Sequence, residues 1–166
     1  VSSAASDVYK RQVLCIGAGG LGSSVLIYLA AVGIGKIGIV DNDYVEKSNL
    51  QRQIIHETNS IGNLKIDSAR ERIKKFNPNI KLISFAERIC PNNALEIIQE
   101  FDIICDCSDN FGTRYLINDA CLILKKPLIF GSVQGFEGQV SVFNLHKKSP
   151  NLRAVSYTHL RAHETN

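Results

Sequence analysis

Short apolar runs alternate along the chain with longer stretches in which apolar residues recur every three or four positions. Five runs have the length and composition of buried parallel strands: residues 13–16, 36–40, 81–86, 103–107 and 128–133. Helical spacing fills the intervals, at residues 23–32, 63–76, 92–101 and 113–124. Residues 140–143 alternate like an antiparallel strand after a turn at 135–138. The pattern predicts an α/β fold of the Rossmann-like, doubly wound type, a mostly parallel sheet with helices on both faces and an antiparallel edge strand.

Single residues indicate how two of these helices begin and face the core. In the helix predicted at 63–76, Ile66, Ala69, Ile73 and Phe76 share the face expected to pack on the sheet. Asn92 is expected to cap the helix that follows the third strand.

A glycine-rich turn follows the first strand. Gly17, Gly19 and Gly22 have the G-x-G-x-x-G spacing between a predicted strand and a predicted helix. Gly17 allows the tight turn, Gly19 and Gly20 let backbone N–H groups approach a phosphate, and Gly22 permits close packing of helix on strand. The pattern favours a nucleotide site, and its alternative is a glycine-rich turn that binds no nucleotide.

Polar residues with potential ligands follow the second strand. Asp41 lies where dinucleotide folds bind a ribose hydroxyl, about twenty residues past the glycines. The loop at 42–53 leaves the carboxyl end of that strand, and its Arg52 could hold phosphate oxygens with two donors. Lys65 lies in the first turn of the next helix. Taken alone, Arg52 and Lys65 are read as solvated surface residues, the usual position of such side chains, and His56 is expected to be structural.

The fourth strand delivers a second polar cluster to the same edge. Ser108, Asp109 and Asn110 follow it directly. Asp109 is the better candidate for a Mg²⁺–phosphate ligand, since Mg²⁺ takes one or two carboxylates together with phosphate oxygens. Asp106 is instead expected to cap or brace the loop.

Charge and cysteine usage narrow the function classes. The 166 residues carry 19 Lys and Arg against 16 Asp and Glu, a net charge of +3 that gives no general nucleic-acid footprint. No apolar run has transmembrane length and no signal peptide is recognisable. The five cysteines form no C-x-x-C pair. Cys15, Cys105 and Cys107 lie in predicted strands, so we expect buried thiols in a reducing compartment rather than a metal or redox site.

The two ends differ in character from the rest. Residues 7–11 (DVYKR) and 155–159 (VSYTH) can be encoded by one short DNA element read in opposite orientations, which resembles a transposase adapter of sequencing libraries. We interpret 1–12 and 155–166 as translated adapter sequence and 13–154 as a domain truncated on both sides. A natural polar tail is the alternative.

Six motifs in order carry a family resemblance. They are GAGGLG at 17–22, DND at 41–43, SNLQRQ at 48–53, Lys65, SDN at 108–110 and EGQ at 137–139. Together they resemble the ThiF/MoeB/HesA branch of the ubiquitin-activating-enzyme superfamily, over nearly all of 13–143.

The resemblance implies an ATP-dependent adenylyltransferase. Such enzymes activate the C-terminal Gly-Gly carboxylate of a ubiquitin-like sulfur carrier of the MoaD or ThiS kind, for molybdopterin or thiamine biosynthesis. The resemblance also implies a cytoplasmic homodimer, with no nucleic-acid or membrane partner. A structural zinc site and a reactive cysteine are expected only in a C-terminal part that these 166 residues do not include. On this resemblance, 13–154 is a truncated ATP-binding adenylation domain. It is expected to fold poorly and to be inactive by itself, because the missing part would leave apolar sheet surface exposed.

Carried over onto this sequence, the resemblance assigns catalysis to Arg52, Lys65 and Asp109, with Asp109 holding Mg²⁺ through ATP. The nucleotide-binding residues it implies are Gly17, Gly19, Gly20, Gly22, Asp41, Asp43, Ser48, Asn49, Gln51, Arg52, Lys65, Asp109 and Asn110.

Three other functions use parts of the same pattern. An NAD-dependent oxidoreductase would use the glycines and Asp41, but would leave Arg52, Lys65 and Asp109 without a purpose. A non-catalytic binder of a ubiquitin-like protein would not need those three side chains. A relative that adenylates a transfer RNA base modification is the third, and SNLQRQ resembles the sulfur-carrier branch more closely.

Overall fold

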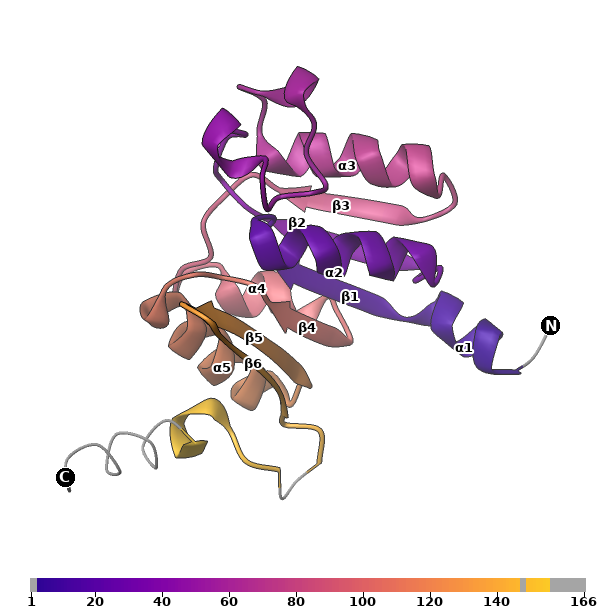
Figure 1. Cartoon of the computed structure of the whole chain (residues 1–166). Helices are drawn as coiled ribbons and strands as arrows, with labels where there is room; N and C mark the ends of the chain where they lie inside the picture. The colour runs from indigo at the N-terminus through magenta and orange to yellow at the C-terminus, as the bar shows by residue number, and fades with distance from the viewer. Residues whose placement is uncertain (1–2, 147–148, 156–166) are drawn as a thin grey trace.

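A six-stranded sheet forms the centre of the molecule (Figure 1). The computed structural model describes residues 3–146 and 149–155. The strands are β1 (Gln12–Ile16), β2 (Lys36–Val40), β3 (Lys81–Phe85), β4 (Ile103–Asp106), β5 (Leu128–Gln134) and β6 (Glu137–Phe143). Their order is β3-β2-β1-β4-β5-β6, all parallel except β6, which pairs antiparallel with β5. The chain first builds outward from β1 to β3 and then returns to pair β4 with β1, so the order reverses between β1 and β4.

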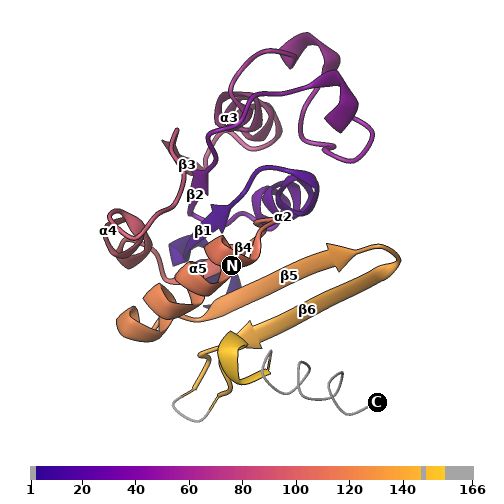
Figure 2. The ribbon, with the colours of Figure 1, turned by 90° about the vertical axis from the view of Figure 1, so that its left-hand side faces the viewer.

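Helices cover both faces of this sheet (Figure 2). They are α1 (Ser3–Lys10), α2 (Gly20–Ala31), α3 (Lys65–Phe76), α4 (Ala94–Gln99) and α5 (Phe111–Leu124), with short 3₁₀ turns η1 (Lys47–Asn49) and η2 (Thr58–Ser60). α2 and α3 pack on one face and α4 and α5 on the other. The predicted doubly wound fold with an antiparallel edge strand is confirmed.

The alternation of side chains along the strands creates a core on each face. In β1, Val13 and Cys15 point into the core beneath α2 and α3, while Leu14 and Ile16 point into the core beneath α4 and α5. All four side chains are almost completely buried. This two-sided burial explains why the strand reads as a continuous apolar run rather than an alternating one.

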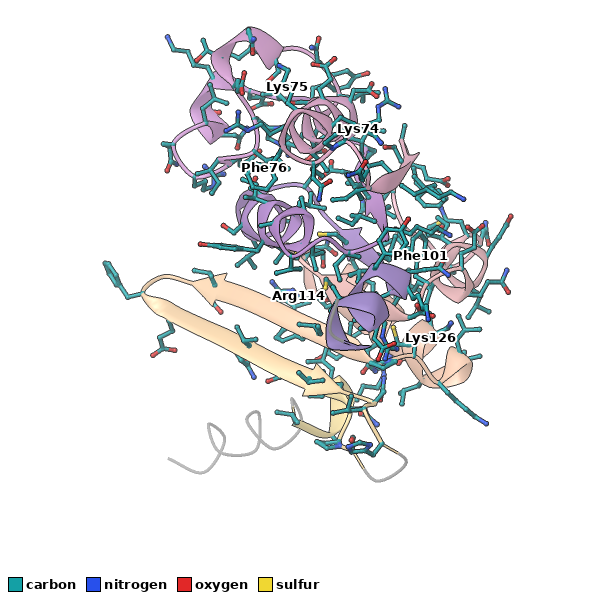
Figure 3. All side chains as sticks on the ribbon, turned by 90° about the vertical axis from the view of Figure 1, so that its right-hand side faces the viewer. Lys74, Lys75, Phe76, Phe101, Arg114 and Lys126 are labelled. Carbon is teal, nitrogen blue, oxygen red and sulfur yellow. The ribbon has the colours of Figure 1, made fainter. Side chains whose placement is uncertain are left out.

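Three details of the predicted elements were wrong. Phe76 is 58% exposed, because it is the last residue of α3 and lies with Lys74 and Lys75 at the end of that helix (Figure 3). The N-cap of α4 is Asn93 rather than Asn92, and its Oδ1 accepts a hydrogen bond from the Cys90 N–H. Cys107 lies one residue beyond β4 instead of within it and is half-buried.

The β5–β6 hairpin extends as an arm beyond the body of the sheet (Figure 2). Its inner face, which includes Phe130 and Phe143, packs into the core beneath α5. Its outer face exposes Val133, Val140 and Val142. The hairpin is thus one of several places where apolar side chains are exposed.

The ends of the chain contact the folded part where the structure describes them. The carbonyl of Tyr9, in α1, lies so close to Gly35 that a β-carbon there would overlap it. Near the other end, the Leu152 N–H donates to Asn118 Oδ1 at 3.0 Å. Residues 1–2 and 156–166 lie outside the described residues, whereas 3–12 include α1 and the first residue of β1. The interpretation of 1–12 and 155–166 as adapter sequence stays a prediction. Within the described part, no helix combines the length and apolar character needed to cross a membrane.

Candidate active site

The loops that leave the carboxyl ends of β1, β2 and β4 surround a cavity of about 1110 Å³. It lies at the point where the strand order reverses, which is where open α/β sheets bind ligands. Most of the predicted site residues line it: Gly17, Gly19, Gly20, Asp41, Asp43, Asn49, Arg52, Lys65, Asp109 and Asn110. Gly22, Ser48 and Gln51 do not. Segments about ninety residues apart in sequence therefore meet over the glycine turn.

The glycine turn is closed by main-chain contacts that leave no room for side chains. Gly17 has a φ of +100°, and a β-carbon there would lie 2.7 Å from the Cys107 carbonyl oxygen. A β-carbon on Gly22 would overlap the Gly17 carbonyl, so Gly22 acts beneath the turn rather than in the cavity. Gly19 is the N-cap of α2, and no side chain caps this end. The N–H groups of the first turn of α2 are thus available to an anion.

Asp41 fastens the glycine turn to the loop after β2. Its Oδ2 accepts the Ala18 N–H at 2.7 Å and its Oδ1 accepts the Asp43 N–H at 2.8 Å. Each carboxylate oxygen keeps a second lone pair, so these bonds still allow the predicted contact with a ribose hydroxyl. The structure adds a structural role that the sequence pattern did not indicate.

Lys65 is a buried cation at the edge of the cavity. Only 8% of its side chain is exposed, and its Nζ lies 2.9 Å from Asp43 Oδ2, whereas the Asp43 side chain is 64% exposed. The alternative of a solvated lysine is therefore wrong. Since buried lysines are almost always paired, Asp43 holds this charge in place, and a phosphate in the cavity would compete with Asp43 for it.

The side chain of Arg52 is exposed and lies against the glycine turn. Its side chain packs over Gly20, where a β-carbon would lie 3.8 Å from Arg52 Cδ. One Nη2 hydrogen bond, 3.0 Å to Asn49 Oδ1, orients the guanidinium. The other donors of the fork face the cavity or solvent without a protein acceptor among the described residues, which leaves them available to phosphate oxygens.

Two carboxylates lie at the end of β4. Asp106 accepts hydrogen bonds from the loop that follows, and Asp109 has no partner among the described residues. Asp109 is exposed at the cavity edge, and no described residue forms a hydrogen bond or ion pair with it. Asn110 caps α5, accepting the Thr113 N–H at 2.9 Å. Asp106 Oδ1 accepts from the Ser108 N–H and hydroxyl, so Asp106 braces the loop as predicted. Burial raises the pKa of Asp106, while the bonds from Ser108 oppose that shift.

Arg114, which no sequence pattern singled out, is a buried arginine in the cavity wall (Figure 3). Its Nη2 donates to the Ser108 carbonyl at 3.0 Å and its Nη1 to Ser132 Oγ at 2.9 Å. The guanidinium also lies over the Phe130 ring, 5.2 Å from its centroid. Arg114 therefore joins the Ser108–Asn110 loop to β5. The only sequence feature that pointed to a place in the site was its position in the first turn of α5, directly after that loop.

His56 joins the glycine turn to α3. It is 5% exposed, its Nε2–H donates to the Ala18 carbonyl at 2.9 Å, and its Nδ1 lies 2.9 Å from Ser68 Oγ. The expectation of a structural histidine agrees with this position. Burial lowers the pKa of His56, and the nearby charge of Lys65 acts in the same direction.

This lowered pKa makes a prediction about stability. Below the ordinary histidine value of 6.5, the unfolded chain binds a proton that the folded chain takes up only at lower pH, so the free energy of unfolding falls as pH drops. One such group contributes a slope of at most about 1.4 kcal/mol per pH unit. His56→Gln should lose less stability between pH 7.5 and 5.5 in urea titrations than the unsubstituted chain. His146→Gln, at an exposed position, should keep the original slope, and equal slopes for all three proteins would contradict the prediction.

Comparisons with known proteins agree with this geometry. The chain is 56% identical over 135 residues to a probable molybdopterin-synthase adenylyltransferase of Porphyra purpurea, covering 81% of this chain and 35% of that protein. It is 48% identical over 151 residues to the probable adenylyltransferase/sulfurtransferase MoeZ of Mycobacterium tuberculosis, covering 91% and 38%. The chain thus spans little more than a third of the length of these relatives.

A solved structure and the model of a protein family also match this chain. The tRNA N6-threonylcarbamoyladenosine dehydratase TcdA of E. coli, solved in complex with ATP, superimposes with a TM-score of 0.78 at 26% identity, covering 82% of this chain and 57% of that one. The pattern of the ThiF family matches residues 3–165. On this match and on its curated relatives, the chain belongs to the ThiF family.

Proposed function

We propose that this chain carries the ATP-binding and adenylating site of an enzyme that activates the C-terminal Gly-Gly carboxylate of a ubiquitin-like sulfur carrier. The observation that carries the proposal is the convergence of Arg52, Lys65 and Asp109 on the open N-terminus of α2. The names of its relatives from Porphyra purpurea and Mycobacterium tuberculosis support the adenylyltransferase chemistry.

The reaction is a displacement at the α-phosphorus of ATP. A carboxylate oxygen of the carrier attacks that phosphorus, the bond to the β-phosphate oxygen breaks, and pyrophosphate leaves with the electron pair. Asp41 would accept a ribose hydroxyl, and the amides of Gly19 and Gly20 would lie along the phosphates. Arg52 and Lys65 would offset the negative charge that builds on the phosphoryl oxygens. Positioning and electrostatics suffice for such a transfer, and no covalent enzyme intermediate is needed.

The donor set of the site fits Mg²⁺. Asp109 offers an exposed carboxylate with no ion-pair partner among the described residues, which suits a cation that takes one or two carboxylates plus phosphate oxygens. Asp109 would hold the ion, with Asn110 alongside, and the bound ion would neutralise phosphate charge.

The remaining parts of the proposal concern the whole protein. We assign it to the cytoplasm, as a homodimer without nucleic-acid or membrane partners, and to either molybdopterin or thiamine biosynthesis. Any structural zinc site belongs outside the described residues. The similarity to TcdA suggests the competing function, which is action on a transfer RNA. The sequence identity to TcdA is 26%, lower than the 56% identity to the molybdopterin-synthase adenylyltransferase of Porphyra purpurea.

Two measurements test the proposed function. Isothermal titration should show binding of ATP·Mg²⁺ and no binding of NAD, and the reverse would establish the oxidoreductase alternative. Pyrophosphate exchange into ATP should depend on a carrier that ends in Gly-Gly and should vanish when the last glycine is deleted. Exchange that requires transfer RNA instead of the carrier would contradict the proposal, and ATP binding with no exchange would indicate a non-catalytic binder.

A further inference from the structure

Two thiols meet at the floor of the cavity, beneath the glycine turn. Cys15 lies in β1 and Cys107 directly after β4, and their Sγ atoms are 3.8 Å apart. Cys15 is completely buried, whereas Cys107 is half-buried and lines the cavity. The hydrogen bond to Cys107 and burial raise the pKa of the Cys15 thiol. Of the two residues, Cys107 is therefore the more accessible from the cavity, and Cys15 lies behind it as a neutral thiol.

The main chain of Cys107 is wedged against the turn that would hold the phosphates. Its N–H donates to the Ile16 carbonyl at 2.9 Å, and its carbonyl oxygen fills the space next to Gly17. The Cys107 β-carbon would lie 3.7 Å from a β-carbon on Gly22. Movement of the Cys107 sulfur toward β1 would press on these packed contacts between the Cys107 main chain, the glycine turn and the Ser108–Asn110 loop.

We propose that Cys107 and Cys15 form a reversible redox pair that responds to peroxides. The peroxide oxidises the Cys107 thiol to a sulfenic acid and is itself reduced to water or an alcohol. The Cys15 sulfur then attacks the Cys107 sulfur and displaces hydroxide, which leaves as water with the Cys15 proton, giving a Cys15–Cys107 disulfide. Two thiols thus lose two electrons and two protons to one peroxide, and a dithiol reductant reverses the change.

Disulfide formation would weaken nucleotide binding. The two sulfur atoms must close from 3.8 Å to about 2.05 Å, which draws the Ser108–Asn110 loop against the glycine turn. This consequence rests on the proposed function, in that ATP is taken as the ligand of the cavity. Formation of the disulfide itself does not depend on the identity of that ligand.

The test is peptide mapping of the chain after exposure to hydrogen peroxide. Cleavage before aspartate separates the cysteines, because it releases Cys15 in residues 7–40, Cys105 in 102–105 and Cys107 in 106–108. We expect a linked 7–40/106–108 peptide that disappears with dithiothreitol, forms several-fold more slowly with saturating ATP·Mg²⁺, and accompanies at least a tenfold rise in the Kd for ATP. Cys90→Ala, remote from the pair, should still form the link, and Cys15→Ala should not.

The outcomes separate this inference from the proposed function. Peptides 7–40 and 106–108 that stay unlinked after peroxide would overturn the redox pair, even where the reduced chain binds ATP normally. A linked peptide together with an unchanged Kd for ATP would overturn the proposed effect of the disulfide on nucleotide binding. Failure of the reduced chain to bind ATP would count against the proposed function alone. Mapping of the unsubstituted chain decides the chemistry, so the test stands even where Cys15→Ala does not fold.

Discussion

In a protein completed to the length of its relatives, Asp109→Ala should abolish pyrophosphate exchange, lowering its rate by about 1,000-fold or more, equivalent to about 4 kcal/mol. The carboxylate is exposed at the cavity edge and has no partner among the described residues, so its removal should leave the fold intact while removing the ligand proposed for Mg²⁺. The rate of exchange at saturating ATP·Mg²⁺ measures the effect, and the thermal unfolding temperature checks the fold.

Titration of ATP in the presence of EDTA provides the specific control. If Asp109 acts only through the metal, its loss should not weaken the binding of metal-free ATP. Because the variant also removes a negative charge near the phosphates, its affinity for metal-free ATP should be equal or slightly higher. Asp67→Ala, on the surface of α3 and paired with Arg70, should exchange at the normal rate. Near-normal exchange in Asp109→Ala would be incompatible with the proposed role.

Arg52→Ala should lower kcat/KM for exchange by about 30- to 1,000-fold, or 2–4 kcal/mol of transition-state stabilisation. Asn49 holds the guanidinium over Gly20. From there its remaining N–H groups can donate hydrogen bonds to phosphate oxygens as the negative charge on those oxygens increases. Because that charge is larger in the transition state than in bound ATP, most of the loss should fall on kcat rather than on ATP affinity.

Two arginine variants make this result specific. Arg52→Lys keeps the charge but loses the planar fork, so it should recover only part of the rate. Arg70→Ala removes an exposed arginine whose carboxylate partner is Asp67, outside the cavity, and should have no effect on exchange. A loss confined to KM for ATP in Arg52→Ala would assign this residue to ground-state binding.

The elements of the fold could be predicted because each depends on local pattern. Strands buried on both faces give apolar runs, and the spacing of Gly17, Gly19 and Gly22 marks the strand–turn–helix unit. Details failed at the ends of elements, where packing decides the outcome. Phe76, the last residue of α3, is exposed instead of buried, and Cys107 lies one residue past the end of β4.

The cavity residues were predictable only through their order along the chain. Nothing in the sequence links Lys65 to Asp43, twenty-two residues earlier, and the pairing arises because α3 begins beside the loop after β2. Arg114 was missed because a charged residue in the first turns of a helix reads as solvated. Its burial depends on Phe130 and Ser132, which β5 supplies.

The surface beneath the proposed phosphates is built from polypeptide backbone, namely the glycine turn, the amides that open α2 and the Cys107 carbonyl. Backbone is common to every amino acid, so evolution can replace most surrounding side chains without altering this surface, provided that positions 17 and 22 stay glycine. Ancestry is then preserved more faithfully in shape than in sequence, in keeping with the TM-score of 0.78 at only 26% identity to TcdA.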